Sequence, residues 1–203
     1  MTHQRVEMAD YLRTYLNGGT YFFTVVTYLS FPIFKQEAAV NLLNDCFLGI
    51  MKEHPFKIDA IVIMPDHLHT ILTLPDEDSG FSIHWKQIKG TFSRNYLGEK
   101  VRNGTKSMMT KNEKGVWQRR FWEHTIRNQE DFNRHCDYIH YNPVKHGLVH
   151  SPSEWKFSSF RKFVEKGLYN GDWGKVVRKR FDGYGFRIVV LRWWVSPTLL
   201  DCS

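Results

Sequence analysis

The sequence predicts an α+β domain, because segments with two different apolar periodicities alternate along the chain. Aromatic and β-branched residues crowd short stretches such as residues 20–28, a pattern typical of a buried strand. Apolar residues recur at helical spacing in longer stretches such as residues 35–53. The chain has 203 residues, of which 42% are hydrophobic. This length supports one domain with a buried core, and this composition argues against intrinsic disorder.

Seven segments carry these patterns in the order strand, helix, strand, strand, helix, strand, helix. The predicted strands are residues 20–28, 56–64, 67–74 and 121–127, and the predicted helices are residues 35–53, 81–98 and 129–141. Pro65 and Asp66 form a turn signal between two strands, which predicts a hairpin. Asn128 is expected to cap the last helix, with Glu130 and Asp131 in the first turn, where the helix dipole favours acids. The first six segments match the βαββαβ unit of the ferredoxin-like class, with an antiparallel sheet.

Residues 1–175 are predicted to form this single domain, followed by a basic and then apolar tail over residues 176–203. Residues 100–120 contain seven Lys and Arg against one acid, and they are predicted to be a mobile loop. The N-terminus has no apolar segment of the kind found in signal peptides, and the apolar stretch over residues 21–34 is too short to span a bilayer. The sequence therefore predicts a cytoplasmic protein with no membrane contact.

The composition favours a partner made of phosphates and bases. Lys and Arg number 28 against 21 Asp and Glu, which gives a net charge of +7, and the chain also contains 15 Phe, seven Trp and nine Tyr. Basic side chains neutralise phosphates and aromatic rings stack on bases. The three cysteines share no CxxC spacing, which argues against a disulfide framework and a cysteine zinc site. Composition alone still leaves open a basic protein without a polyanionic partner.

His67 and His69 flank Leu68 on the third predicted strand. Because side chains alternate along a strand, both imidazoles point to one face and Leu68 points to the other. Leu68 can then enter the core while the two imidazoles converge on a cation. Two exposed strand histidines without a metal fit the same spacing.

The last predicted helix carries two stripes. The polar stripe consists of Arg134, His135, Tyr138 and Asn142, and the apolar stripe consists of Phe132, Cys136 and Ile139. A tyrosine hydroxyl can act as a nucleophile where a cation stabilises its phenolate, and an asparagine oxygen can bind a hard divalent metal. Pro143 disfavours helical dihedral angles at Asn142. A solvated helix face with a packing tyrosine explains the polar stripe as well.

Several segments resemble one known family. PDHLH at residues 65–69 resembles the His-hydrophobic-His signature of single-tyrosine HUH endonucleases. Residues 117–149, WQRRFWEHTIRNQEDFNRHCDYIHYNPVKHGLV, closely resemble the REP-associated tyrosine transposases, relatives of the insertion-sequence HUH transposases. Residues 18–28 and 155–173 extend this resemblance over most of residues 15–175. The resemblance implies a ferredoxin-like catalytic domain with a C-terminal catalytic helix, and a divalent metal, Mg²⁺ or Mn²⁺. It also implies a nuclease and strand transferase that acts on single-stranded DNA with hairpin-bearing, REP-like repeats through a 5′-phosphotyrosine.

Carried over by position, the resemblance makes Tyr138 the nucleophile, His67 and His69 metal ligands, and Asn142 the third ligand. The residues expected to contact DNA are Arg119, Arg120, Arg127, Arg134, His135, Lys106, Lys111 and Lys114. The protein is expected to act as a monomer.

Two other hypotheses remain at this stage. A non-catalytic single-stranded nucleic-acid-binding module explains the charge and the aromatic content equally well, with structural histidines. A metal-dependent phosphohydrolase could use Asp66 and His67, although the chain lacks the further His and Asp motifs of such enzymes. The presence of His67, His69 and Tyr138 together favours the nuclease, since a binding module does not need all three.

Overall fold

The computed structural model describes residues 16–98, 114–179 and 187–189. Its centre is a four-stranded antiparallel sheet in the order β2-β3-β1-β4. The strands are β1 (Thr20–Val26), β2 (Lys57–Ile63), β3 (His67–Thr73) and β4 (Trp122–Thr125), and the helices are α1 (Glu37–Glu53), α2 (Phe81–Asn95), α4 (Gln129–Lys145) and α5 (Phe160–Glu165). This order confirms the predicted ferredoxin-like βαββαβ unit with a further helix after it.

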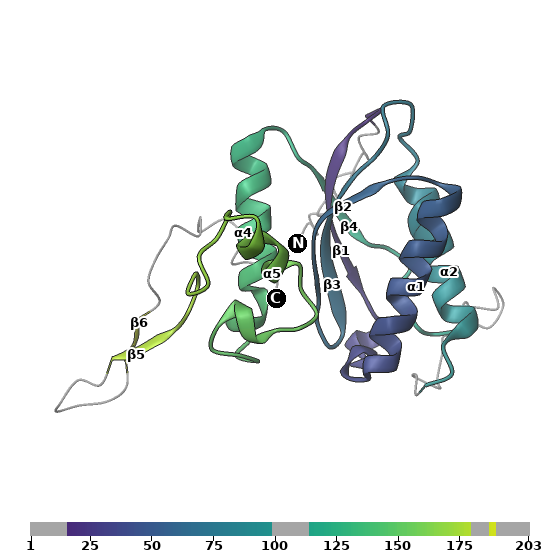
Figure 1. The fold of residues 1–203 in the computed structure, drawn as a ribbon. Coiled ribbons are helices and arrows are strands. Elements are labelled where there is room, and N and C mark those ends of the chain that lie inside the picture. The colour runs from purple at the N-terminus through teal and green to yellow at the C-terminus, as the bar shows by residue number, and fades with distance from the viewer. Residues whose placement is uncertain (1–15, 99–113, 180–186, 190–203) are drawn as a thin grey trace, which may run out of the picture.

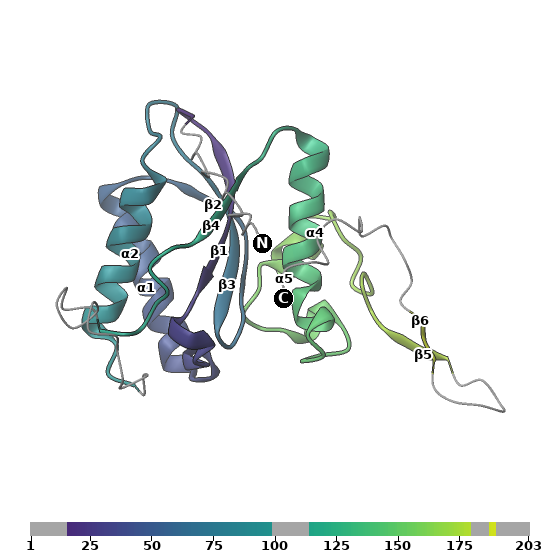
Figure 2. The same cartoon turned by 180° about the vertical axis from the view of Figure 1, so that it is seen from behind.

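The sheet separates two layers of helices. Helices α1 and α2 cover one face, and α4 with α5 lies on the other (Figure 1). The view from behind shows the same arrangement, with the sheet between the two helical layers (Figure 2). Short 3₁₀ turns lie at Tyr28–Ser30, Ile33–Lys35 and Pro152–Glu154, and a separate two-stranded ribbon joins β5 (Val177–Lys179) to β6 (Arg187–Val189).

The face under α1 and α2 holds the larger core. Strand residues such as Tyr21, Phe23 and Leu68 meet Phe47 of α1 and Trp85 of α2, and all five are buried. Apolar residues at helical spacing in α1 and α2 supply the matching stripes, as the sequence predicts. Burial of this apolar and aromatic surface is the main source of stability for the domain.

The face under α4 holds a smaller apolar cluster of buried residues: Phe22, Ala60, Val62, Met64, Ile71, Cys136 and Ile139. These residues come from alternate strand positions and from the predicted apolar stripe of α4. The same face carries the histidine pair, because His69 pairs with Thr24 and His67 with Val26 across β3 and β1. Helix α4 therefore lies directly over the polar positions of the sheet.

The end of α4 differs from the sequence prediction, which placed it at residue 141. The helix continues to Lys145 with Pro143 inside it, so Asn142 is helical. Pro143 and Val144 are both buried, and the carbonyl of Pro143 accepts a hydrogen bond from the Leu148 amide at 2.9 Å. Packing against the sheet thus overrides the local bias of a residue that precedes proline. The predicted cap is confirmed, since the Asn128 side chain accepts a hydrogen bond from the Asp131 amide at 2.9 Å.

The basic segment before β4 is only partly described. Residues 99–113 lie outside the described residues, and these include Lys106 and Lys111. Val116 and Trp117 are buried in the larger core, so the predicted mobile loop does not extend through residue 120. No helix in the described part of the chain is long and apolar enough to cross a membrane.

Candidate active site

The histidine pair lies at the start of β3, under α4. The rings of His67 and His69 are 4.8 Å apart between centroids. His67 Nδ1 is 2.6 Å from an oxygen of Asp66, and His69 Nδ1 is 2.9 Å from Thr24 Oγ1. With each Nδ1 atom already engaged, Nε2 is the atom of each ring that remains for a ligand. Outer partners of this kind fix the orientation of metal-binding histidines.

Burial sets the protonation state of His69. The ring is buried, and this loss of water lowers its pKa well below the usual value for histidine. The neighbouring charges of His67, His146 and Lys145 lower the pKa further. A neutral imidazole at neutral pH has a free lone pair, which is the form that binds a metal cation.

Tyr138 faces the histidine pair from α4. Its ring centroid is 5.0 Å from that of His69 and 5.9 Å from that of Phe22, both in edge-on geometry. Lys145, two turns further along the helix, places its Nζ atom 5.3 Å from the centre of the Tyr138 ring. A cation over an aromatic ring is attracted to its negative face. The structure therefore brings the predicted nucleophile and the predicted metal ligands together.

Asn142 lies one helical turn after Tyr138 and is fully buried. Neither its side-chain oxygen nor its side-chain nitrogen has a hydrogen-bond partner. A buried amide without partners costs free energy, so such a group in a protein calls for an explanation. A divalent cation would supply one, because an amide oxygen and the imidazole nitrogens of His67 and His69 are ligand types that such a metal accepts.

His146 extends the same helical stripe beyond Asn142. It follows α4 directly, is exposed, and its ring lies 5.7 Å from that of His67. The two rings line one side of a cavity of about 250 Å³, together with Asp66 and Met64. This opening gives His67 and His146 contact with solvent at the end of the molecule where β3 begins, while His69 stays buried.

Tyr141, the nearest alternative nucleophile, points elsewhere. Its ring contacts Trp173 with centroids 6.4 Å apart. Burial raises the pKa of the Tyr141 hydroxyl, which disfavours its phenolate. Of the two tyrosines, Tyr138 is the one placed for chemistry at His67 and His69.

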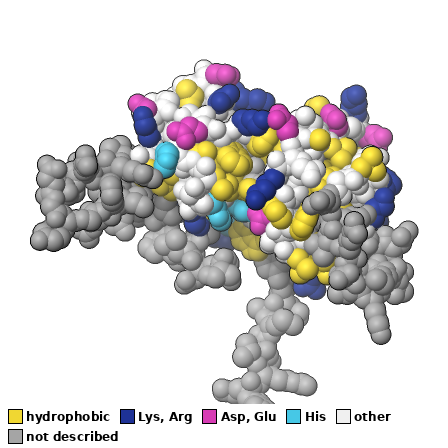
Figure 3. Space-filling model, turned by 90° about the horizontal axis from the view of Figure 1, so that it is seen from below, with side chains coloured by type: hydrophobic (Ala, Val, Ile, Leu, Met, Phe, Trp, Pro, Cys, Tyr) yellow, Lys and Arg dark blue, Asp and Glu magenta, His cyan; other side chains and the backbone are white. Residues whose placement is uncertain are grey.

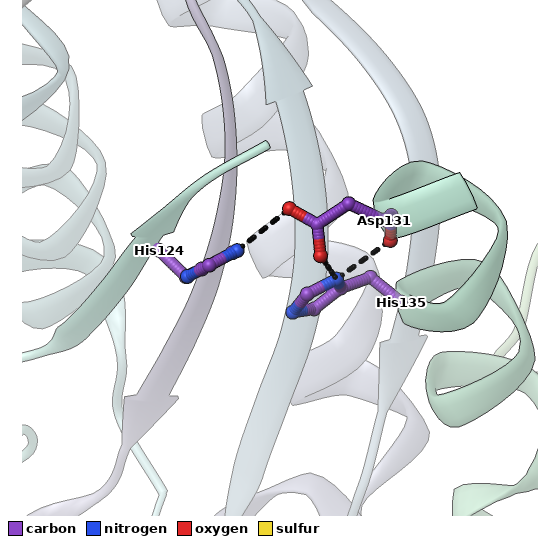
Figure 4. A group of neighbouring side chains, drawn as sticks. All are labelled: His124, Asp131 and His135. Carbon is purple, nitrogen blue, oxygen red and sulfur yellow. Dashed lines mark hydrogen bonds and ion pairs between the residues drawn. The ribbon is translucent and has the colours of Figure 1, made fainter. Parts of the chain in front are cut away.

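A second polar cluster joins β4 to the start of α4 (Figure 4). His124 Nε2 is 2.8 Å from Asp131 Oδ2, and His135 Nδ1 is 2.8 Å from the Asp131 carbonyl oxygen. These three residues bring ligand atoms within 4.8 Å of one another, so the group could hold a metal. The carbonyl can only accept, however, so His135 Nδ1 carries the proton and is not a ligand atom. We interpret the cluster as an anchor that fixes the first turn of α4 to the edge strand.

His135 therefore does not lie on a solvated stripe. It is buried against Phe22, with ring centroids 4.7 Å apart, and burial lowers its pKa. The sequence prediction included it among the DNA contacts, and it lies three residues before Tyr138, on the same face of the helix. In the structure that face packs on the sheet, so His135 positions the helix and is not proposed as a DNA contact.

The other predicted DNA contacts form a scattered set. Those that the structure describes are all exposed: Arg119, Arg120, Arg127, Arg134 and Lys114. Arg134 is within 3.7 Å of Glu130 and 3.4 Å of Asp131, so part of its charge is balanced on the helix. Viewed from below, Lys and Arg side chains are spread around a zone of hydrophobic and histidine side chains (Figure 3).

Sequence reasoning missed three contributors to the site. Thr24 and Phe22 lie on β1, on the face that also bears the histidines, and strand alternation could have marked them only once the register with β3 was known. Lys145 lies seven residues after Tyr138, a spacing that returns to the same helix face. The predicted end of the helix at residue 141 hid that relation.

The fold and this site define a class of protein. A ferredoxin-like domain in which a His-hydrophobic-His pair meets a tyrosine from a following helix is the arrangement of single-tyrosine HUH proteins. Comparison with known proteins gives the same answer, since residues 17–142 match the model of the family described as "Transposase IS200 like". A REP-associated tyrosine transposase of Escherichia coli K12 is 40% identical over 166 residues, which cover 82% of this chain and 91% of that protein.

A solved structure agrees with these sequence comparisons. A REP-associated tyrosine transposase bound to a REP hairpin superimposes with a TM-score of 0.67 and 38% identity, covering 90% of this chain and 99% of that one. The chain belongs to the IS200-like transposase family and, within it, to the REP-associated tyrosine transposases. Tyrosine transposases are enzymes that cleave and rejoin DNA.

Proposed function

We propose that this enzyme is a metal-dependent endonuclease and strand transferase that acts on single-stranded DNA through a phosphotyrosine at Tyr138. The observation that carries the proposal is the placement of the Tyr138 ring 5.0 Å from the ring of His69, within an oriented histidine pair. The buried Asn142, whose side chain has no hydrogen-bond partner, lies one turn along the same helix and would serve as the third ligand. A protein that only binds nucleic acid has no need for this combination.

The metal would be held by Nε2 of His67, Nε2 of His69 and the side-chain oxygen of Asn142. Mg²⁺ and Mn²⁺ both suit a set of imidazole and amide ligands, with Mn²⁺ favoured by the two nitrogens. When bound, such an ion stabilises the negative charge that develops on the phosphate oxygens during cleavage. Asp66 and Thr24 would keep the two rings in their binding orientation.

Tyr138 would perform the covalent step. Its hydroxyl oxygen attacks the phosphorus, the bond from phosphorus to the 3′ oxygen breaks, and the 3′ oxygen takes up a proton as the tyrosine loses one. The product is a 5′-phosphotyrosine and a free 3′-OH, and attack by a 3′-OH reverses the step and rejoins the strand. Lys145 would lower the cost of the phenolate from its place over the ring.

The proposed substrate is DNA with hairpin-bearing, REP-like repeats, because the solved relative is bound to a REP hairpin. The exposed Arg119, Arg120 and Arg127 would contact its phosphates. We propose a monomer as the active form. Sedimentation of the protein with and without the hairpin DNA measures that state directly.

The test of the covalent step is an adduct assay. The protein is incubated with labelled hairpin DNA and Mg²⁺ or Mn²⁺ and analysed on a denaturing gel. Tyr138→Phe should keep the fold, since one hydroxyl is lost, and should abolish the adduct. Tyr141→Phe is the matched control and should retain it. An adduct that persists in Tyr138→Phe would show that another residue is the nucleophile.

The metal role has its own test. His67→Ala and His69→Ala should each lose the adduct and still bind the hairpin DNA, because binding depends on basic and aromatic side chains. Excess EDTA should reproduce this loss in the unmodified protein. Tight hairpin binding with no adduct under any metal condition would instead support the non-catalytic binding module.

A further inference from the structure

We propose that Trp122 is a stacking platform for one unpaired base of the DNA strand beside the cleaved phosphate. This inference rests on the proposed function, since it concerns how that substrate is held. It gives the ring of Trp122 a role in positioning and specificity that is distinct from the covalent chemistry at Tyr138.

Trp122 lies at the active site. It is the first residue of β4 and pairs with Thr24, the residue whose hydroxyl meets His69. Its ring is 5.6 Å from that of Phe22, and Phe22 in turn contacts the rings of His69 and Tyr138. One aromatic side chain therefore separates Trp122 from both the nucleophile and a metal ligand.

The ring is available to a partner. Trp122 is 46% exposed, and the other large exposed hydrophobic side chains of the described residues are all aliphatic. Strand β4 also ends the described sheet, with β1 on one side only. Single exposed hydrophobic residues are common on proteins, but this one is a large aromatic ring at the margin of a nuclease site.

The orientation of the ring is fixed by what lies behind it. The ring of His124 is nearly parallel to that of Trp122, at 7° and 6.0 Å, and the ring of His135 stacks on His124 at 18° and 4.8 Å. Asp131 holds both histidines (Figure 4). A rigid ring loses little conformational freedom when a flat partner stacks on it, which favours binding.

The positive charge near Trp122 indicates what kind of molecule would stack on the ring. Arg119 and Arg120 precede Trp122 closely in the chain and are both exposed, so two cationic side chains come from the segment next to the ring. Phosphates next to stacked bases are the chemistry of single-stranded DNA, whereas an apolar peptide would leave this charge unused. An unpaired base is therefore the occupant that both the ring and the arginines favour.

The experiment measures binding without cleavage. In the Tyr138→Phe background, the affinity for a hairpin DNA with single-stranded flanks is measured by fluorescence anisotropy. Trp122→Ala and Trp122→Leu should both bind about five- to a hundredfold more weakly, the range for loss of one base stack. Trp122→Phe should retain most of the affinity. Ile83→Ala, an exposed change on α2 across the sheet, is the control and should have no effect.

A second measurement locates the base. Each flanking nucleotide is replaced in turn by an abasic one. The loss of affinity is then compared between the protein that retains Trp122 and the protein with Trp122→Leu. One abasic position should weaken binding to the Trp122 protein and leave binding to Trp122→Leu unchanged, because the contact is already gone. The effects of the abasic nucleotide and of Trp122→Leu on the binding free energy are then not additive, which identifies this nucleotide as the one that stacks on Trp122.

Three outcomes would overturn the inference. Equal binding by Trp122→Leu and the Ile83→Ala control would show that no base stacks on Trp122. The same conclusion would follow if every abasic nucleotide lowered the affinity equally for the unmodified residue and for Trp122→Leu. A change in sedimentation without a change in DNA affinity would show that the ring meets a second copy of the chain. If the Tyr138→Phe protein itself does not bind the hairpin DNA, the proposed function fails first; if it binds normally and Trp122 is neutral, only this inference fails.

Discussion

The sheet face under α1 and α2 and the face under α4 are built from alternate residues of the same strands. Val25 and Leu68 point into the larger core, while their neighbours Thr24 and His69 point toward α4. The first face is almost wholly apolar. The second combines a small apolar cluster with histidines, a tyrosine and a partnerless amide. The first face therefore supplies most of the stability, and the second also holds polar groups, such as Asn142, that do not stabilise the fold.

The largest effect should come from the apolar face. Trp85 is fully buried among Phe23, Phe47 and Phe121. Trp85→Ala should lower the free energy of unfolding by about 3–5 kcal/mol, because it removes a large buried ring and leaves a cavity. Urea unfolding followed by circular dichroism measures this loss.

The control for this change is Leu97→Ala, at a residue that is 95% exposed. Its unfolding free energy should stay within about 0.5 kcal/mol of the unmodified protein. If Trp85→Ala costs less than 1 kcal/mol by the same measurement, the apolar face does not have the role that we assign to it.

A substitution on the face under α4 should raise the free energy of unfolding instead of lowering it. Asn142→Leu replaces a buried amide that has no hydrogen-bond partner with an apolar side chain of similar size. Without metal, the unfolding free energy should rise by about 1–3 kcal/mol, the cost of an unsatisfied buried polar group. The variant should also lose the covalent DNA adduct.

Metal addition sharpens this test. Mn²⁺ or Mg²⁺ in excess should stabilise the unmodified protein, since a ligand that binds only the folded state favours it. The same addition should leave Asn142→Leu unchanged. An Asn142→Leu protein that is less stable than the unmodified one without metal would show that the amide has partners in solution and is not kept for a ligand.

The apolar face could be predicted from the sequence and the site face only in part. The strands of this face and the helices α1 and α2 that cover it could be predicted from periodicity. A helix that buries one stripe has apolar residues at helical spacing, and a strand that buries one face has them at alternate positions. On the site face, residue type and the family resemblance marked His67, His69 and the proposed nucleophile Tyr138. The contacts that complete the site were not visible in one sequence.

These missed contacts depend on long-range pairing. The register of β1 against β3 brings Thr24 to His69, and the register against β4 brings Trp122 to Thr24. No local pattern encodes a register between strands that are about forty to a hundred residues apart. The helical state of Asn142 was also mispredicted, because the local effect of Pro143 was weaker than packing on the sheet.

A smaller effect should appear as a dependence on pH. Burial lowers the pKa of His135 in the folded protein, whereas the unfolded ring titrates near about 6.5. Below that pH the unfolded state takes up a proton that the folded state does not, so the free energy of unfolding falls as the pH falls. His135→Phe removes this contribution, and its pH dependence should be shallower by at most about 1.4 kcal/mol per pH unit.

Unfolding in urea at several values between about pH 7.5 and pH 5.5 checks this prediction. The comparison is the difference between His135→Phe and the unmodified protein, since buried histidines outside this cluster, such as His140, contribute equally to both. Parallel curves would mean that His135 is protonated to the same extent in the folded and unfolded states, and that the anchor at the start of α4 does not exclude water.

The smallest effect concerns Lys145, which is exposed and lies over the Tyr138 ring with Nζ 5.3 Å from its centre. An exposed contact of this kind is worth about 0.5–1 kcal/mol, so Lys145→Gln should slow adduct formation about two- to fivefold. The effect should fade at high salt, because screening weakens an exposed charge. Lys156 makes a similar contact with Phe157 at 4.8 Å, away from the site. Lys156→Gln should therefore leave the rate unchanged, and equal slowing by the two substitutions would show that Lys145 acts through the general charge of the protein and not through the nucleophile.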